Sequence, residues 1–282
     1  MPELPEVETM RRGLLPVLGC RIQSAVLPHC TKRPISIRPA WEEFCRRITG
    51  QEIVRLERVG KRVVVVLNSE DRLIFEPRMT GLVLLADPPT TEHLRLKLEL
   101  SEPTASLMYW DRRGLGSVHL LSSDEFASEF CSTRFGPDAL QMTPDLWPLR
   151  FGTSRQEIKP ALLDQKRVLG IGNLYASEIL FLAQIHPQRQ CMELKSAEWT
   201  TLHKATQEVL ETAILHEGST LSDGTYRNAL NQAGSYQNQH RVYDREGLLC
   251  LRCGKSNIQR MVQAQRSTFF CPTCQPLGKK RK

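Results

Sequence analysis

Apolar positions near the start of the chain follow a helical period. Between residues 5 and 18 they recur three or four positions apart, from Val7 through Met10 and Leu14 to Leu18. Acidic residues come early in this segment and arginines late, which is the charge order that the helix dipole favours. We therefore predict a helix over residues 5–18.

The pattern changes between Arg21 and about Leu121. Short apolar runs alternate with Gly, Asn, Asp and Pro, a spacing typical of β-strands joined by turns. Many short strands predict a β-sandwich or barrel-like domain. We expect the first helix to pack on this domain and the extreme N-terminus to be free to reach a groove. The predicted strands are residues 53–56, 62–67, 73–75, 82–85, 94–100 and 118–121.

Helical periodicity returns after residues 134–147, a segment rich in turn residues that we expect to cross to a second domain. A polar stretch of roughly 20 residues then follows at 218–238, and loops of that length are usually functional or disordered. The sequence thus predicts an α+β protein in three parts, residues 1–134, 135–245 and 246–282. The predicted helices are residues 154–164, 173–183 and 196–216.

Charge and hydropathy narrow the function classes. The 38 Lys and Arg residues exceed the 31 Asp and Glu residues, giving a formal charge of +7 that favours a polyanionic partner. No apolar run is long enough to span a bilayer, and residues near the N-terminus do not resemble a secretory signal. We expect a cytoplasmic protein. The tail Lys279–Lys282 predicts a solvated end with at most a weak phosphate contact.

Four of the nine cysteines form two closely spaced pairs. Cys250 and Cys253 are separated by two residues, as are Cys271 and Cys274, and 17 residues lie between the pairs. This spacing predicts one structural Zn²⁺ ion bound by four thiolates, which folds the module and performs no chemistry. The other five cysteines are scattered, so we interpret them as free thiols in a reducing compartment.

The residues between the cysteine pairs combine cations with aromatic rings. Arg260, Arg266, Ser267 and Thr268 precede Phe269 and Phe270. A basic tip on an apolar base is suited to gripping a phosphodiester backbone. The alternative is an ordinary solvated loop.

The N-terminal residues suggest covalent chemistry. Removal of Met1 would leave Pro2 with a free secondary amine, which is partly unprotonated at neutral pH and can act as a nucleophile. Attack on a sugar C1′ would give an iminium ion that acidifies the C2′ proton. Glu3 and Glu6 lie next to Pro2 and could supply general acid and base functions. The alternative is that Pro-Glu simply starts a helix.

Six motifs occur in an order that identifies a family. The chain resembles the formamidopyrimidine-DNA glycosylase family over its whole length. The motifs are the PELPEVET opening at residues 2–9, Lys61 of a β-hairpin, Met79-Thr80-Gly81, Arg113, residues 159–165 leading into the helix–two-turn–helix segment at 170–175, and the zinc-finger run at residues 265–272.

The resemblance implies a set of catalytic residues. Pro2 would form a Schiff base, Glu3 would help to open the deoxyribose ring, and Glu6 would help to order water in the site. Lys61 and Arg266 would grip phosphates around the lesion and assist β- and δ-elimination. The implied enzyme is a monomeric glycosylase and abasic-site lyase of the bacterial nucleoid, which removes 8-oxoguanine and formamidopyrimidines from double-stranded DNA.

The resemblance also implies DNA contacts on several loops. A damaged base must leave the duplex before its sugar can be attacked, and side chains then fill the gap. Met79 would fill that gap, Arg113 would face the orphaned base, and a loop would close over the extruded base. The other residues implied in DNA binding are His93, Leu115, Arg155 and Asn173, with Thr225 and Tyr226 in the closing loop.

The chain departs from the family pattern in three places. Relatives usually read His-Leu-Gly-Met where this chain has Glu76-Pro77-Arg78-Met79. We expect this change to weaken phosphate binding locally, with Arg78 as the compensating cation. Leu115 stands where relatives have a phenylalanine wedge, so stacking beside the lesion should be weaker. The closing loop is about two residues longer than usual.

Three other functions compete with this hypothesis. The first is an endonuclease VIII-like glycosylase for oxidised pyrimidines, which shares the Pro-Glu start. The second is a DNA-binding protein that grips damaged duplex without cutting it, although the presence of Pro2, Glu3 and Lys61 argues against this. The third is a zinc-ribbon protein acting on RNA or ribosomes, which leaves the N-terminal motif unexplained.

Overall fold

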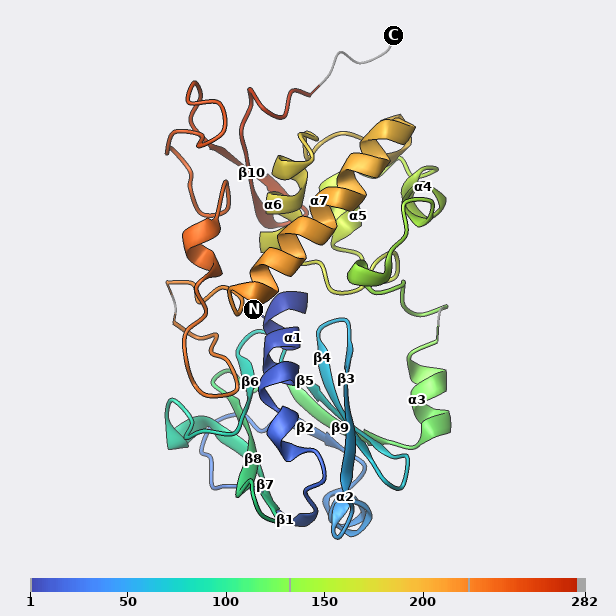
Figure 1. Cartoon of the computed structure of the whole chain (residues 1–282), viewed down its shortest axis with the longest axis vertical. Coiled ribbons are helices and arrows are strands. Elements are labelled where there is room, and N and C mark those ends of the chain that lie inside the picture. The colour runs from blue at the N-terminus through green and yellow to red at the C-terminus, as the bar shows by residue number, and fades with distance from the viewer. Residues whose placement is uncertain (1, 132, 223, 278–282) are drawn as a thin grey trace. The chain divides into compact units, whose positions relative to one another are not determined.

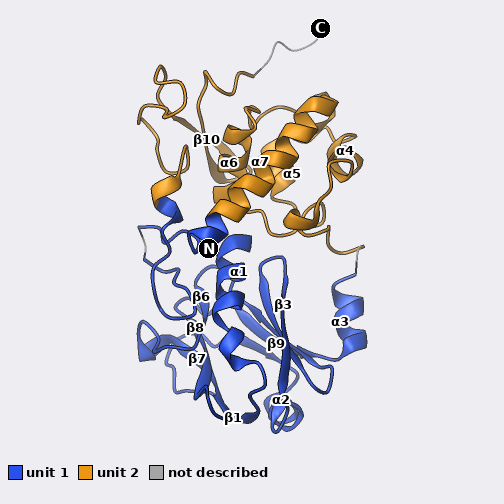
Figure 2. Cartoon of the chain, viewed as in Figure 1, with its two compact units in different colours: residues 1–131, 213–237 blue, residues 132–212, 238–282 orange. Residues whose placement is uncertain are grey.

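The computed structural model describes residues 2–131, 133–222 and 224–277. Met1 and the basic tail at 279–282, for which we made predictions above, lie outside the described residues. The chain divides into two compact units. As Figure 2 shows, one unit combines residues 1–131 with residues 213–237, and the other combines residues 132–212 with residues 238–282. Each unit is described by itself, and the predicted three-part division stays a prediction.

The first unit contains two β-sheets (Figure 1). One sheet has the strand order β1-β7-β8-β6 and is antiparallel throughout. The other has the order β2-β9-β5-β4-β3, in which only β2 and β9 are parallel. The strands are β1 (Ile22–Val26), β2 (Ser36–Arg38), β3 (Ile53–Val59), β4 (Arg62–Leu67), β5 (Arg72–Glu76), β6 (Gly81–Leu84), β7 (Leu94–Leu100), β8 (Ser106–Asp111) and β9 (Ser117–Leu121).

The central strands of the five-stranded sheet are buried on both faces. Alternate residues of β4 point to opposite faces, as the pleat requires. Val63 and Val65 join the main core, which also contains residues of the four-stranded sheet. Val64 and Val66 join a smaller core against Phe126 of α3 (Ser123–Glu129). Two sheets that share one core form the predicted sandwich.

The first helix is confirmed but shorter than expected. Helix α1 covers Leu4–Gly13, and a 3₁₀ turn follows at Leu15–Val17. Its first turn is buried, and so is Pro2. The expectation that the extreme N-terminus is free to reach a groove stays a prediction, because Met1 lies outside the described residues.

Several elements between residues 21 and 151 were not predicted. Strand β8 is apolar enough to have been recognised, whereas β1 and β2 contain exposed positions that hide their pattern. Helix α2 (Trp41–Ile48) lies inside the stretch that we interpreted as β-rich, and buries only Phe44 and Ile48. Helices α3 and α4 (Leu146–Phe151) were also missed.

The second unit is built from helices and one β-hairpin. Helix α5 (Ile158–Leu162) is much shorter than predicted, whereas α6 (Asn173–Leu182) agrees to within one residue. Gln165 fixes the two turns between them, because it donates to the carbonyls of Leu163 and Ile171 and accepts from Gly170 N. Helix α7 (Ser196–Leu215) begins in this unit, and its last residues belong to the first unit. The hairpin consists of β10 (Gln259–Gln263) and β11 (Arg266–Phe270).

Among the described residues, no helix combines the length and apolar character needed to cross a membrane.

Candidate functional site

Two glutamates shape the start of α1. Glu3 is the N-cap residue, and its side chain accepts from the backbone of Glu6 while Glu6 Oε2 accepts from Glu3 N at 2.9 Å. This reciprocal pair is a capping box, which satisfies donors that the first helical turn leaves open. Both side chains are buried, with 4% of Glu3 and 3% of Glu6 exposed. The capping box therefore holds two carboxyl groups beside Pro2.

Glu6 is also bound by a distant segment of the same unit. Its Oε1 accepts from Ser219 N at 2.9 Å. Gly218 has φ +78°, and a Cβ there would lie 2.9 Å from Glu6 Oε1, so only glycine fits without displacement. Tyr226 completes the contact, because its hydroxyl donates to the carbonyls of Glu6 and Glu217 at 3.3 and 2.9 Å. The polar segment 218–238 is therefore attached to the first helical turn.

Thr225 and Tyr226, the two residues predicted to close over an extruded base, are both buried. Tyr226 packs in the hydrophobic core of the first unit, and burial together with the nearby Glu6 carboxylate raises its pKa well above the usual value. Thr225 accepts a hydrogen bond from Arg112 Nη2 at 2.9 Å. Within this unit the two residues anchor their loop, and their contact with DNA stays a prediction.

Lys61 lies at the tip of a β-hairpin. Gly60 and Lys61 form the two-residue turn between β3 and β4, and Gly60 has φ 58°, as such turns require. The hairpin is linked to α1 by the buried carboxylate of Glu8, which pairs with Arg58 at 3.1 Å. Burial by itself would raise the pKa of Glu8, but hydrogen bonds from Arg11 and Arg12 and the charge of Arg58 lower it to about 2. Glu8 thus connects the N-terminal helix to the strand that precedes Lys61.

Met79 and Arg113 lie on two loops that are bonded to each other. Asp111 is completely buried, and its carboxylate accepts from the Thr80 hydroxyl and from Gly116 N at 2.8 Å. Arg113 N donates to both Thr80 Oγ1 and Asp111 Oδ1. Met79 has 38% of its surface exposed, and Arg113 is exposed. Thr80 and Asp111 therefore fix the loops that present these two side chains.

Leu115 and His93 are half-buried. Leu115 lies in the loop that begins at Asp111, close to Arg113. The His93 ring packs edge-on against Trp110 at 5.5 Å, and its Nε2 lies 3.8 Å from the carboxylate of the neighbouring Glu92. Both DNA-contact assignments stay predictions.

In the second unit a buried lysine joins the helices to the hairpin. Lys159 is 1% exposed, and its Nζ donates to Asn173 Oδ1, to the Ser267 carbonyl and to Thr268 Oγ1 at 2.8–2.9 Å. Asn173 Nδ2 donates to the same Ser267 carbonyl at 3.0 Å. The exposed side chain of Arg266 begins one residue earlier. Asn173 and Lys159 together therefore position the strand that carries Arg266.

This arrangement corrects part of our interpretation of the finger. Thr268 is buried, and the Ser267 carbonyl accepts from the buried Lys159. The exposed residues of that group are therefore Arg260 and Arg266, and Arg260 Nε donates to the Ser267 hydroxyl. Arg155 is exposed before α5. Lys159 was missed as a site residue because a lysine in a short helix normally indicates a solvated position. Three further residues could be recognised as supports of the site only from their contacts in the structure, namely Glu8, Thr80 and Asp111.

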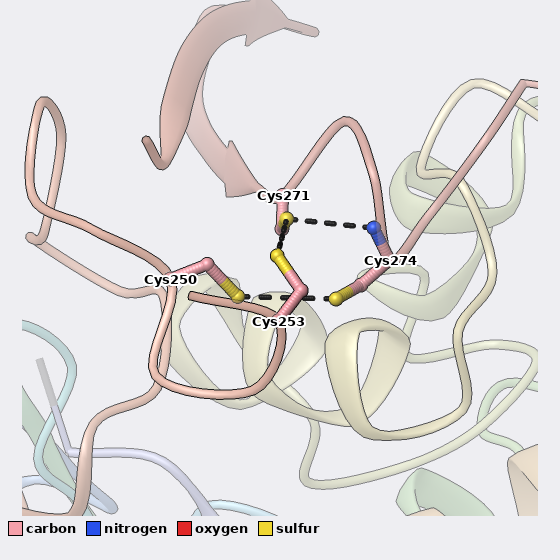
Figure 3. Close-up of side chains that lie close together, drawn as sticks. All are labelled: Cys250, Cys253, Cys271 and Cys274. Atoms are coloured by element: carbon pink, nitrogen blue, oxygen red, sulfur yellow. Dashed lines mark hydrogen bonds between the residues drawn. The ribbon is translucent and has the colours of Figure 1, made fainter. Parts of the chain in front are cut away.

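The four paired cysteines converge as predicted (Figure 3). Cys250 Sγ lies 3.8 Å from Cys274 Sγ, and Cys253 Sγ lies 3.8 Å from Cys271 Sγ. A tetrahedral Zn²⁺ ion with bonds of about 2.3 Å would separate its sulfurs by about 3.8 Å. All four sulfurs lie within 4.8 Å of one another. The cluster therefore fits one structural zinc ion with no open coordination position.

Backbone groups around the cluster favour thiolates. N–H groups of Lys255 and Ser256 lower the pKa of the Cys253 thiol to about 6. Gln275 is fully buried, accepts from Cys271 N at 3.0 Å and donates to the Ile185 carbonyl at 2.9 Å. Such outer contacts orient the ligands and join the zinc loop to the rest of its unit.

Three segments of the chain match models of known protein families. Residues 1–118 match the formamidopyrimidine-DNA glycosylase N-terminal domain. Residues 135–225 match the formamidopyrimidine-DNA glycosylase H2TH domain, and residues 247–277 match the zinc finger found in these glycosylases and in isoleucyl-tRNA synthetase.

Individual proteins resemble the chain over nearly its whole length. The formamidopyrimidine-DNA glycosylase of Chloroflexus aurantiacus is 39% identical, with 98% of each chain covered. Two crystal structures of the Lactococcus lactis enzyme, one a variant with Fapy-dG-containing DNA and one with abasic-site DNA, are each 34% identical with a TM-score of 0.87. They cover 98% and 97% of this chain and 100% and 99% of their own. A protein with this sandwich, this helix–two-turn–helix unit and this finger belongs to the formamidopyrimidine-DNA glycosylase family. This family assignment takes the place of the alternative hypothesis of a zinc-ribbon protein acting on RNA or ribosomes.

Proposed function

We propose that the protein is a base-excision-repair enzyme that removes oxidised purines from double-stranded DNA and cuts the strand at the resulting abasic site. The observation that carries this proposal is the cluster at the N-terminus, where Pro2 lies beside two buried carboxyl groups held by a capping box. The solved relatives bind DNA with a formamidopyrimidine lesion or an abasic site, which are the substrate and the intermediate of this reaction.

The chemistry begins at the Pro2 nitrogen. Once Met1 has been removed, this secondary amine attacks C1′ of the damaged nucleotide, and the bond from C1′ to the base breaks. The base leaves with a proton, and Glu3 protonates O4′ as the deoxyribose ring opens. The nitrogen then shares its electron pair with C1′ as an iminium ion. Glu6 lies within the same hydrogen-bond network and would order water there.

Strand cleavage follows from the same intermediate. The iminium ion accepts electrons when the C2′ proton is removed, so the C3′–O bond breaks by β-elimination. A second elimination breaks the C5′–O bond, and hydrolysis of the imine frees Pro2. Lys61 and Arg266 would grip the phosphates that flank the lesion and stabilise the departing negative charge. The chain's charge of +7 supports the electrostatic part of this binding.

The remaining predicted contacts complete the proposal. Met79 and Arg113, on loops joined by Thr80 and Asp111, would fill the gap and face the orphaned base. Asn173 and Arg155 would contact the DNA backbone, and His93 would make another contact with the DNA. The substrate implies work on the chromosome in the bacterial cytoplasm.

The test is to trap the iminium ion. The protein is incubated with a duplex carrying 8-oxoguanine opposite cytosine in the presence of borohydride, which reduces the ion to a stable amine. We expect a covalent adduct that maps to Pro2, no adduct with Pro2→Gly, and strongly reduced strand cutting with Glu3→Gln. Correctly processed wild type that binds the duplex tightly but forms no adduct would show a damage-binding protein. Faster excision of an oxidised pyrimidine would favour the endonuclease VIII-like alternative.

A further inference from the structure

Glu76 and Arg78 form an ion pair next to the exposed Met79. Strand β5 ends at Glu76, whose Oε1 lies 2.9 Å from Arg78 Nε and 3.2 Å from Arg62 Nη2. The side chain of Glu76 is 17% exposed, whereas that of Arg78 is 60% exposed. The carboxylate is thus largely enclosed, and Arg78 extends from it toward solvent.

The backbone around this pair is held firmly. The Tyr109 hydroxyl donates to the Glu76 carbonyl at 3.0 Å, and Gly81 N donates to the Pro77 carbonyl at 2.8 Å. A Cβ on Gly81 would lie 2.5 Å from both Pro77 Cα and the Tyr109 hydroxyl, so the turn closes as tightly as it does only with glycine. Arg78 itself has φ 50°, a left-handed conformation that residues other than glycine rarely adopt.

The ion pair leaves the far end of Arg78 available. Glu76 pairs with Nε, and within the described residues neither Nη nitrogen of Arg78 donates a hydrogen bond to the protein. Two parallel N–H donors in one plane match the oxygens of a phosphate, and Arg binds such anions more specifically than Lys does. The second cation, Arg62, balances the Glu76 charge, so the trio carries a net positive charge.

We infer that Arg78, oriented by Glu76, is a phosphate ligand for the lesion-bearing DNA strand in this protein, two residues after the position at which the family pattern has an imidazole and this chain has Glu76. The inference rests on the proposed function. Glu76 then acts as a positioning residue, and its negative charge is tolerated near DNA because Arg62 and Arg78 both pair with it. Removing Arg78 would cost a phosphate contact and expose a carboxylate to the DNA backbone at the same time.

The experiment measures binding to a duplex with a tetrahydrofuran abasic-site analogue by fluorescence anisotropy between 50 and 200 mM salt. We expect Arg78→Ala to weaken binding about three- to tenfold and to lower the salt slope by about 1, the effect of one lost phosphate contact. Arg55→Ala is the matched control, because Arg55 is also an exposed, ion-paired arginine of the same unit, with 48% of its side chain exposed. The DNA affinity and the salt slope of Arg55→Ala should equal those of wild type.

Glu76→Gln in two backgrounds separates positioning from simple repulsion. In wild type we expect Glu76→Gln to weaken binding, because Arg78 loses its orienting partner. In Arg78→Ala we expect the same change to strengthen binding, because it removes an uncompensated negative charge. Stronger binding in both backgrounds, or unchanged affinity and slope in a folded Arg78→Ala, would overturn the inference. Failure of wild type itself to bind and cut would instead refute the proposed function.

Discussion

The two hairpins that carry the predicted phosphate-binding cations are stabilised in different ways. Lys61 forms part of the turn between β3 and β4, and these strands belong to a five-stranded sheet whose central strands are buried on both faces. Arg266 follows the turn between β10 and β11, which form a sheet of only two strands. Ala264 and Gln265 occupy that turn with φ values of 45° and 60°, although neither is glycine.

The difference shows how a fold compensates for a small core. An isolated two-stranded sheet is marginal in water, so the second hairpin needs stabilisation from outside its own strands. It receives this from the zinc site at its base and from Lys159 near its tip. The first hairpin belongs to a larger sheet and is also joined to α1 by the ion pair between Arg58 and Glu8 and by the hydrogen bond from Arg11 Nη1 to the Leu56 carbonyl. Removing one stabilising group should therefore disturb the position of Arg266 far more than the position of Lys61.

Removing the metal is the strongest test of this comparison. We expect Cys253→Ser, or treatment with a chelator, to unfold the β10–β11 hairpin and to weaken DNA binding by at least about 100-fold, because structural zinc contributes on the order of 10 kcal/mol to folding. Amide spectra of the first unit should stay dispersed. The control is Cys45→Ser, outside the cluster, which should keep zinc and binding. Unchanged binding after verified zinc loss would contradict the comparison.

The next effect concerns Lys159. Lys159→Met keeps the shape of the buried side chain but leaves three acceptors without their shared donor, so we expect a loss of roughly 3 kcal/mol in the free energy of unfolding. Retained zinc together with about tenfold weaker DNA binding would show that Arg266 has lost its position. Lys204→Met, at an exposed position of α7, serves as control. A stable Lys159→Met protein with wild-type affinity would refute the role of this lysine.

The smallest effect is expected at Glu8. Its pKa falls from an ordinary 4.5 to about 2 in the folded protein. A lowered carboxyl pKa gives stability that is present above pH 4.5 and lost as the pH falls toward 2, up to roughly 3 kcal/mol. Glu8→Gln should lose about 1–3 kcal/mol at pH 7. Urea titrations should show the difference from wild type shrinking below pH 4.5, and a constant difference would rule out this linkage. Glu52→Gln, in a more exposed ion pair, should have almost no effect.

The sequence predicted those elements whose pattern is local and unambiguous. Residues 62–67 and 94–100 were placed to the residue, because an apolar run defines the first strand and strict alternation of leucine with charged residues defines the second. Strand β2 gains its stability from parallel pairing with β9, some eighty positions further along the chain, and such pairing leaves no local signal. Helix α2 was overlooked because its surroundings suggested strands.

The candidate site was predictable where a local sequence motif indicates a particular chemistry. The cysteine spacing predicted the zinc site, and the N-terminal motif pointed to Pro2, Glu3 and Glu6. The residues that hold these groups were not predictable, because their importance lies in contacts between distant segments. Ser219 binds Glu6 across 213 positions, and Lys159 reaches Thr268 across 109 positions. No periodicity or spacing in the sequence reports such pairs.

The discontinuity of the first unit has a consequence for its synthesis. Tyr226 and Ala229 belong to the core that β1 to β9 enclose, yet they are translated about a hundred residues after β9. The sandwich therefore cannot complete its core, nor Glu6 its bond to Ser219, until the ribosome has released most of the chain. A nascent or truncated polypeptide would carry Pro2 without the framework around it. The chain order thus delays completion of the structure around Pro2 until the protein is nearly complete.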